Sequence, residues 1–264
     1  MFFYFIYYRQ IGQACSLYKN MQKKDIRQVY SLKKYGSKER FGADVENARN
    51  FQKELDKLLE QQEKNQENGK RLFLHSCCAP CSSYVLEYLR KYFRITVFYY
   101  NPNISFANEY KRRAAEQKRL IEAYNRQGIG YPIEVLEGDY EPEQFYQTAK
   151  GLEDCPEGGE RCFLCYELRL RKTAELAQKG SYDYFATTLT ISPLKNAKKL
   201  NEIGERLSQE YHVNWLVSDF KKKNGYKRSI ELSAEYDLYR QDYCGCVYSK
   251  QEREKQKAER KNEA

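Results

Sequence analysis

Short apolar segments alternate with longer helical segments between residues 71 and 217. The short segments are rich in β-branched and aromatic residues, as strands are, and the longer ones repeat apolar residues at helical spacing. Parallel strands joined by helices of this length are covered by helices on both faces. The pattern therefore predicts an α/β fold with an open, mostly parallel Rossmann-like sheet in three α/β/α layers. The expected strands are residues 71–74, 94–100, 131–137, 184–189 and 213–217, and the expected helices are residues 82–92, 107–127, 163–179 and 196–211.

Two segments of different composition flank this core. Residues 1–47 are basic and tyrosine-rich without a clear period, and an amphipathic helix is expected just after them, over residues 50–59. Residues 251–264 alternate Lys, Arg, Glu and Gln, so we expect a charged tail that is either helical or disordered. The catalytic α/β domain is accordingly expected over residues 48–250, between a helical N-terminal extension and a C-terminal helical region.

Charge and apolar content limit the class of protein. The chain has 264 residues and a net charge of +9, which favours a polyanion such as nucleic acid as partner. A highly charged soluble surface gives the same composition. The apolar stretch at residues 1–8 is far shorter than the roughly 20 residues that span a bilayer. We therefore expect no membrane association and a cytoplasmic location.

Five cysteines are spaced as metal ligands. Cys77, Cys78 and Cys81 follow the first expected strand, and Cys162 and Cys165 lie far downstream. Two C-x-x-C pairs at long separation usually place four thiolates on one metal. Four thiolates suit either a structural zinc site or a [4Fe–4S] cluster, and the fifth is left for chemistry or a second metal. The first group is expected at the carboxyl end of a parallel strand, which is where such sheets bind ligands.

The sequence Cys244-Gly245-Cys246 differs from both of these groups. Two cysteines that flank a glycine can close a small strained disulfide, and strained bridges are the labile or catalytic kind. A pair of metal ligands, or two free thiols in a turn, fits the same spacing. Cys15 stands apart in the N-terminal arm, and Cys155 has no partner at metal-ligand spacing.

Other polar residues are expected near the same edge of the sheet. His75 precedes the thiolates, where it can bind metal, donate a proton or hold a backbone group. Hydroxyl groups and an ammonium after the fourth strand can hold phosphate or ribose. These residues are Thr187, Thr188, Ser192 and Lys195. Residues 236–243 mix tyrosines with cationic and polar groups, which suits a flipped base or an RNA loop, or else a helix that packs its tyrosines inward.

Taken together, these blocks resemble the QueH family of epoxyqueuosine reductases. The resemblance covers about residues 48–250 and depends on the cysteines within their local sequences. Cys15 and Cys155 match no motif of the family. The matching blocks are Leu74–Cys81, Tyr99–Ile104, Arg161–Leu170, Thr187–Leu189 with Ser192, Pro193 and Lys195, and Tyr239–Cys246.

The resemblance implies the last step of queuosine synthesis in tRNA, in which an oxidoreductase reduces an epoxide to an alkene. The substrate would be epoxyqueuosine at the wobble position of Tyr, His, Asp and Asn tRNAs, and the electron donor would be external. Cys244 and Cys246 would form a redox-active disulfide. A second, mononuclear iron is associated with the family, and Cys81 is the candidate ligand in this chain. The residues implied as ligands of a [4Fe–4S] cluster are Cys77, Cys78, Cys162 and Cys165.

The implied reaction agrees with these residue types. Loss of an epoxide oxygen as water takes two electrons and two protons, and a cluster passes single electrons whereas a dithiol supplies two. A Lewis-acidic iron can polarise the epoxide oxygen, and His75, Asp242 or Tyr243 can deliver protons. A basic face, together with the N-terminal arm, would hold the tRNA backbone, so that binding weakens steeply with salt. That face includes Arg112, Arg113, Lys118 and Arg119.

Two other functions fit parts of the sequence. A sulfur-transfer enzyme acting on tRNA would need an ATP-binding loop after the first strand, and residues 75–78 do not provide one. A non-enzymatic zinc or iron–sulfur sensor would leave Cys244, Cys246 and the polar residues at the strand ends without a role.

Overall fold

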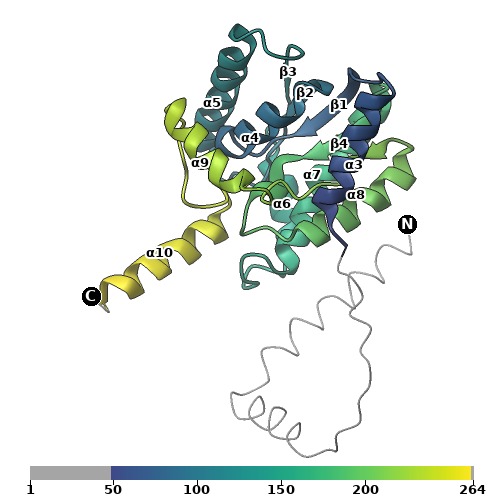
Figure 1. Ribbon diagram of the computed structural model, residues 1–264. Coiled ribbons are helices and arrows are strands. Elements are labelled where there is room, and N and C mark those ends of the chain that lie inside the picture. Colours follow the sequence, from purple (N-terminus) through teal and green to yellow (C-terminus); the bar gives the residue numbers. More distant parts are fainter. Residues whose placement is uncertain (1–48, 263–264) are drawn as a thin grey trace, which may run out of the picture. The chain divides into compact units, whose positions relative to one another are not determined.

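A computed structural model describes residues 49–262. All of the strands in this part of the chain form one open parallel sheet in the order β3-β2-β1-β4-β5 (Figure 1). β1 is central, and its last residue, His75, lies opposite Phe98 on one side and Thr187 on the other. The expected parallel sheet is therefore confirmed. The strands are β1 (Lys70–His75), β2 (Phe93–Tyr99), β3 (Glu134–Glu137), β4 (Tyr184–Thr187) and β5 (Asn214–Trp215).

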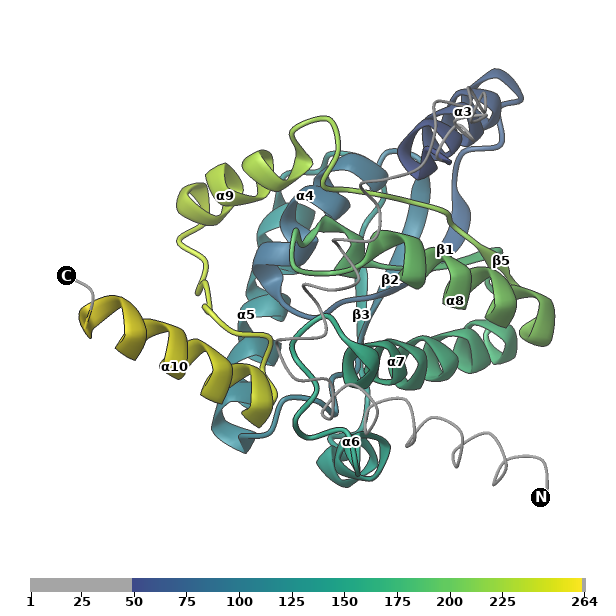
Figure 2. The same ribbon diagram turned by 90° about the horizontal axis from the view of Figure 1, so that it is seen from below.

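Helices cover the sheet on both faces, which confirms the three layers (Figures 1 and 2). Because successive strand residues point to opposite faces, Leu72 and Leu74 pack with α3, α4 and α5, whereas Phe73 packs with α7 and α8. The helices are α3 (Phe51–Lys64), α4 (Ala79–Leu89), α5 (Ala107–Arg126), α6 (Pro142–Ala149), α7 (Glu160–Lys179), α8 (Ala197–Tyr211), α9 (Gly225–Glu235) and α10 (Val247–Asn262), with the short 3-10 helix η2 (Thr188–Ile191) after β4.

Several element boundaries differ from those expected, and two of the differences matter for the site. α4 begins three residues early, at Ala79, because Pro80 is favoured in a first helical turn. α7 begins at Glu160 instead of residue 163. Cys81 and Cys162 consequently lie in the first turns of helices and not in the preceding loops.

The C-terminal helical region consists of α9 and α10, separated by an irregular segment. Residues 236–243 lie in this segment, so they are not a helix that packs its tyrosines inward. Residues 251–262 of the expected tail lie within α10, which begins at Val247. α6 was not expected from the sequence, since only Phe145 and Ala149 of its eight residues are buried.

Residues 50–150 and 156–264 form one compact unit, whereas Gly151–Cys155 group with a separate one. The predicted extension at residues 1–47, with Cys15, lies outside the described residues. Across the described range, no helix combines the length and the apolar character that a membrane span requires.

A cysteine-lined candidate active site

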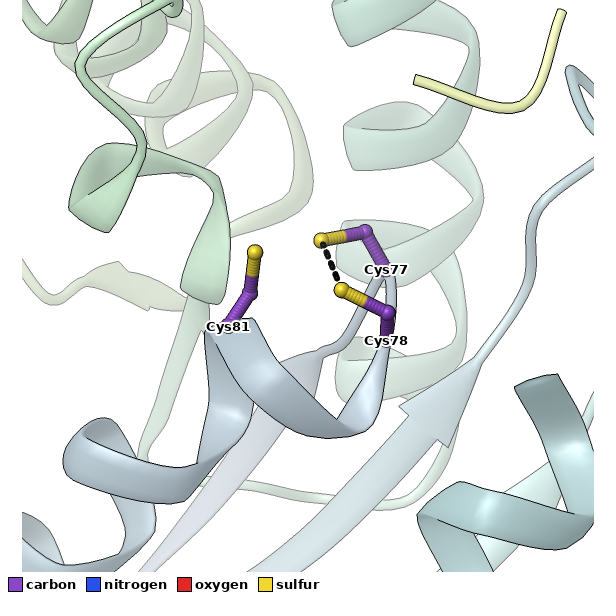
Figure 3. Close-up of side chains that lie close together, drawn as sticks. All are labelled: Cys77, Cys78 and Cys81. Atoms are coloured by element: carbon purple, nitrogen blue, oxygen red, sulfur yellow. Dashed lines mark hydrogen bonds between the residues drawn. The ribbon is translucent and has the colours of Figure 1, made fainter. Parts of the chain in front are cut away.

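Three cysteines lie together where β1 passes into α4 (Figure 3). The Sγ atoms of Cys77 and Cys78 are 3.7 Å apart, and all three sulfur atoms, that of Cys81 included, lie within 4.8 Å of one another. Cys78 caps α4 in an extended conformation, and Cys81 follows in the first turn. Sulfur ligands of one tetrahedral metal lie ~3.8 Å apart, because each metal–sulfur bond is ~2.3 Å long. These three thiols can therefore share a single metal ion.

The three thiols do not ionise alike. Hydrogen bonds from Cys77 and Cys81 stabilise the Cys78 thiolate and lower the pKa of Cys78 well below its usual range. The hydrogen bond to Cys78 in turn raises the pKa of Cys77 to about 11, and hydrogen bonds to Cys77 and Cys78 raise that of Cys81 well above the ordinary value. One thiolate is thus favoured in the metal-free protein, and a bound metal would favour ionisation of the others.

His75, the last residue of β1, precedes this group in the sequence and is 0% exposed. Its Nε2 atom lies 3.1 Å from the carbonyl oxygen of Tyr100, which can only accept, so Nε2 carries the proton. Nδ1 then accepts from the Thr187 hydroxyl at 2.8 Å. Burial, with the nearby Arg169 charge, lowers the pKa of His75 to about 3. Proton donation by His75 stays a prediction, whereas the structure engages both ring nitrogens in holding β1, β2 and β4 together.

The other hydroxyl groups of this edge surround the same turn. The Thr188 hydroxyl accepts a hydrogen bond from the Cys77 backbone N–H at 3.4 Å and lies 3.8 Å from its sulfur. Thr187 and Thr188 therefore order the protein's own turn in this structure, and a role for them in holding phosphate or ribose stays a prediction.

Two further cysteine groups meet in a small pocket. Cys162 and Cys165, in the first turns of α7, line it together with Cys244 and Cys246. Burial raises the pKa of Cys162, that of Cys165 to about 11 and that of Cys246 to about 12. All four carry free thiols.

Gly245 allows the chain to turn between the two C-terminal cysteines. Its φ of +121° disfavours any other residue, and an added Cβ would lie 2.9 Å from the Ile104 side chain. The loop after β2 holds this turn, since Ser105 N–H donates to the Gly245 carbonyl at 3.1 Å. Asn103 Nδ2 donates to the Cys244 sulfur at 3.8 Å. The block at Tyr99–Ile104 that the resemblance singled out thus contacts the Cys244-Gly245-Cys246 turn.

A larger cavity of about 370 Å³ opens beside the small pocket. Cys77, Cys78 and Cys81 line it on one side. Residues 240–244 line it from the C-terminal segment, and residues 191–195 from the loop after η2. Cys244, Glu157 and Lys195 line both hollows, so the two adjoin.

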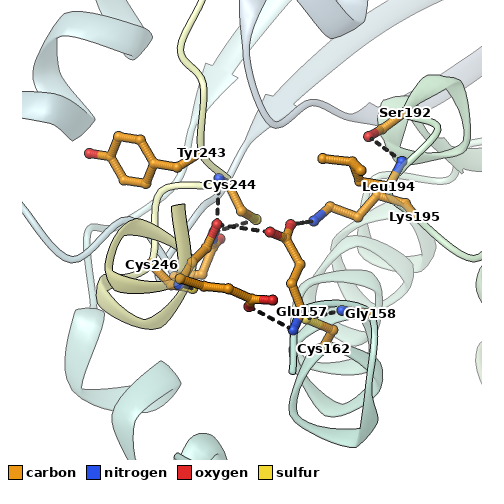
Figure 4. A network of polar contacts seen from close by, with 12 residues as sticks. Glu157, Gly158, Cys162, Ser192, Leu194, Lys195, Tyr243, Cys244 and Cys246 are labelled. Atoms are coloured by element: carbon orange, nitrogen blue, oxygen red, sulfur yellow. Dashed lines mark hydrogen bonds and ion pairs between the residues drawn. The ribbon is translucent and has the colours of Figure 1, made fainter. Parts of the chain in front are cut away.

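A polar network links the two hollows (Figure 4). Lys195 Nζ contacts Glu157 Oε1 at 2.7 Å, and the Ser249 hydroxyl donates to Glu157 Oε2 at 3.1 Å. The same hydroxyl accepts from the Cys244 backbone N–H at 3.0 Å. Burial alone would raise the pKa of Glu157, but Lys195 and Ser249 outweigh it and lower that pKa. Glu157 therefore stays a carboxylate and fixes the backbone at Cys244.

Asp242 and Tyr243 both line the larger cavity but differ as acids. Asp242 is exposed and pairs with Lys257, which lowers its pKa. Burial raises the pKa of Tyr243, and the Arg113 guanidinium lies 5.2 Å from its ring centroid. At neutral pH Asp242 is therefore a carboxylate, and Tyr243 keeps its proton.

The prediction of a basic face on α5 is wrong for Arg113. Arg113 is 2% exposed, because it shares the buried stripe of α5 with Tyr110 and Gln117. Its guanidinium donates to the Cys244 carbonyl at 3.0 Å and pairs with Glu109 at 2.7 Å. Arg113 consequently supports the Cys244 turn and is not part of an exposed face of α5.

Two further residues of the site were not identified from the sequence. Arg169 is fully buried and lines the small pocket, four residues after Cys165 and therefore on the same helix face. The spacing of four residues from Cys165 is the sequence signal that could have identified Arg169. Glu157 lies in a loop, and its pairing with Lys195 brings together segments 38 residues apart, which no local pattern predicts.

The donor types fit the cluster that the resemblance implies, whereas the spacing of Cys77, Cys78 and Cys81 is that of ligands to a single ion. Soft thiolates select zinc or iron–sulfur centres, and the four expected ligands divide between the two hollows, two in each. The small pocket also gathers three buried cations and a single carboxylate. An anionic thiolate-bound cluster suits this excess of positive charge better than a hydrated cation does. The cations are Arg161, Arg169 and Lys195.

The chain is similar throughout this region to proteins of one family. A family model described as epoxyqueuosine reductase QueH matches residues 72–252. The epoxyqueuosine reductase QueH of Staphylococcus epidermidis is 45% identical over 202 residues, which cover 76% of this chain and 84% of that protein. The Streptococcus pyogenes relative is 47% identical over 178 residues, covering 67% and 69%.

A more distant relative, from Thermotoga maritima, is 34% identical over 191 residues, or 71% of this chain and 94% of that protein. The expected family and the expected enzyme class are therefore confirmed. With three cysteine groups joined around two adjoining hollows, the chain is an oxidoreductase that belongs to the QueH family of epoxyqueuosine reductases.

Proposed function

We propose that this chain reduces epoxyqueuosine in tRNA to queuosine, and that the reaction takes place in the larger cavity beside Cys244. The observation that carries the proposal is the convergence of three cysteine groups, far apart in sequence, on two hollows that share Cys244. One hollow is large enough to admit a substrate, and the other is small and lined by thiols. A reductase needs a substrate site and a source of electrons next to each other.

The proposed cofactor is a [4Fe–4S] cluster held by two cysteines from each hollow. When bound, it would supply single electrons at a potential set by its surroundings. Cys81 is the candidate ligand of a second iron, and its sulfur lies within 4.8 Å of the two others in its group. The four proposed cluster ligands are Cys77, Cys78, Cys162 and Cys165.

Cys244 and Cys246 are proposed as the two-electron store. Their oxidation to a disulfide releases two electrons and two protons, and conversion of an epoxide to an alkene and water consumes two of each. The step is therefore balanced, and an external reductant restores the dithiol. Cys244 lines both hollows, which supports its role as the thiol nearer the substrate.

Tyr243 is proposed as the group that donates a proton to the departing oxygen. It lines the cavity next to Cys244 and keeps its proton at neutral pH, whereas Asp242 is ionised. A positioned acid of this kind contributes roughly 10²–10⁴-fold to a rate.

The proposed substrate is the anticodon loop of the Tyr, His, Asp and Asn tRNAs. A cavity of about 370 Å³ suits one flipped nucleoside. Arg240 and Arg253 line it, and the exposed Tyr226 offers a ring for stacking. Because phosphate contacts release counterions, the affinity for tRNA should fall steeply between 50 and 200 mM salt, on the order of tenfold or more.

Nucleoside mass spectrometry tests the proposal directly. Anaerobically purified protein, reduced with dithionite, would be incubated with tRNA that carries epoxyqueuosine, and the tRNA would then be digested. We expect the modified nucleoside to lose one oxygen atom, and unmodified tRNA to remain unchanged. Retention of that oxygen with protein that contains iron and sulfide would refute the proposed reaction.

A further inference from the structure

Arg169 is a buried cation with too few partners. The side chain is 0% exposed, and its Nε donates to the Cys165 carbonyl, one turn earlier in α7, at 3.1 Å. Its Nη1 and Nη2 atoms have no hydrogen-bond partner in the described part of the chain. A guanidinium carries five N–H donors. Most of the donors of Arg169 are therefore unpaired in this structure.

The unpaired end of Arg169 lies among the cysteines. Arg169 lines the small pocket with Cys162, Cys165, Cys244 and Cys246. Thiolates at Cys165, Cys244 and Cys77, one from each cysteine group of the sequence, would each attract it. Arg169 therefore lies close enough to interact with all three groups.

The described residues that line the pocket offer Arg169 no unpaired carboxylate. Among the described residues that line the pocket, the single acid is Glu157, which pairs with Lys195. The Tyr166 ring lies 5.9 Å from the guanidinium carbon, and a neutral ring does not cancel a charge. Burying a charge without a counter-charge is strongly unfavourable, and a well-packed apolar residue would avoid that cost. The site therefore holds a cation that only an anion in the pocket can stabilise.

We propose that Arg169 is the counter-charge of an anionic iron–sulfur cluster bound by the neighbouring cysteines, and that it raises the reduction potential of that cluster. The inference rests on the proposed function, since it assumes the cluster named there. Adding an electron to an anion is easier beside a fixed positive charge. Arg169 would thus both retain the oxidised cluster and favour its reduction.

Four variants of the full-length, anaerobically purified protein test this proposal. Arg169→Gln removes the charge and keeps hydrogen-bonding capacity, Arg169→Lys keeps the charge without the planar fork, and Arg169→Met fills the volume with apolar atoms. The matched control is Arg171→Gln, on the same helix but turned toward Glu167 and Glu210, outside both hollows. Each protein would be assayed for iron, acid-labile sulfide and midpoint potential by EPR-monitored titration.

We expect Arg169→Gln and Arg169→Met to bind the cluster roughly 10–100-fold more weakly under chelator challenge, as loss of a supporting partner does at other metal sites. Their remaining cluster should have a lower midpoint potential than the parent. Arg169→Lys and Arg171→Gln should stay close to the parent on both measures. Parental potential and retention in Arg169→Gln would overturn the proposal.

Thermal unfolding of the metal-free proteins separates this role from a structural one. If Arg169 is retained for the anion, metal-free Arg169→Met should be at least as stable as the metal-free parent, because an unpaired buried charge has been removed. A lower melting temperature would assign Arg169 to the fold and contradict the proposal. Parent protein without iron or sulfide would refute the cluster itself. Parent protein with both, and an Arg169→Gln variant that behaves like it, would refute only the role of Arg169.

Discussion

The two hollows on either side of Cys244 differ in size and in charge. The small one has a volume of about 10 Å³, enough for about one water molecule, and it gathers two guanidinium groups and an ammonium against one carboxylate. The larger one has about 370 Å³ and a lining of both polar and apolar side chains. A small, cationic, thiol-lined space suits stored electrons, and a large space with a mixed lining suits a substrate. Because Cys244 lines both hollows, this one cysteine can take part in both roles.

The two hollows also differ in how the chain builds them. The small one is formed by the first turns of α7 and by the turn before α10, so a helix fixes two of its thiols, Cys162 and Cys165. The larger one is bordered largely by irregular segments, residues 192–195 and 240–244. Rigid elements position reactive groups, whereas loops adapt to ligands. The division of roles between the hollows can be tested by changing one at a time.

Removing the shared thiol should have the largest effect. In Cys244→Ser the two-electron store is lost, so turnover should fall by at least about 10³-fold. Iron and sulfide content should stay at the parental level, because Cys244 is not among the proposed cluster ligands. Cys155→Ser is the matched control and should retain full activity. An active Cys244→Ser protein would refute the proposal that the two hollows divide electron storage and substrate binding between them.

Replacing the proposed acid in the larger cavity should lower turnover less than replacing Cys244 does. Tyr243→Phe removes the hydroxyl and keeps the ring, so kcat should fall by roughly 10²-fold, with the cluster unchanged. Asp242→Asn, at the neighbouring position, should stay within roughly tenfold of the parent, because that carboxylate is already ionised at neutral pH. Single-turnover assays of the two variants would reverse the assignment if Asp242→Asn proved the slower.

Cys81→Ala should distinguish a second metal from the cluster. The variant should lose about one iron per chain while acid-labile sulfide is unchanged, since a mononuclear ion contains no sulfide. Elemental analysis by mass spectrometry, together with a colorimetric sulfide assay, measures both. Parallel loss of iron and sulfide would instead make Cys81 a cluster ligand.

A change far from both hollows should affect stability alone. The Asp56 carboxylate accepts hydrogen bonds from Tyr88 and Gln52 at 3.0 and 3.1 Å and pairs with Lys223. Although burial would raise its pKa, these partners together lower it below 3.8. Its contribution to stability is therefore complete above pH 3.8 and is lost as the pH falls through the lowered value.

We expect Asp56→Asn to lower the free energy of unfolding by about 1 kcal/mol at pH 7. The difference from the parent should shrink below pH 3.8, and urea denaturation at several pH values would measure it. Activity and iron content should not change. A loss of iron in this variant would mean that the effects of site variants also reflect general instability.

Much of the fold could be predicted because its information is local. β-branched runs identify the strands, and cysteine spacing identifies the three thiol groups. The missed features depend on contacts between distant segments. Arg113 was assigned to the surface from its charge, although its place in the buried stripe of α5 indicates the interior. The Glu157–Lys195 pair, and the pocket that leaves Arg169 unpaired, exist only once the helices have packed.

The order of the cysteine groups along the chain has a consequence for biosynthesis. Cys77 lies in the first strand–helix unit of the sheet, whereas Cys246 follows its last strand. At about 5–20 residues per second, a ribosome adds Cys246 roughly ten seconds or more after Cys77. During that interval the earliest thiols are already made while the last wall of the site is missing. Iron delivery to a complete site must therefore follow the synthesis of Cys246.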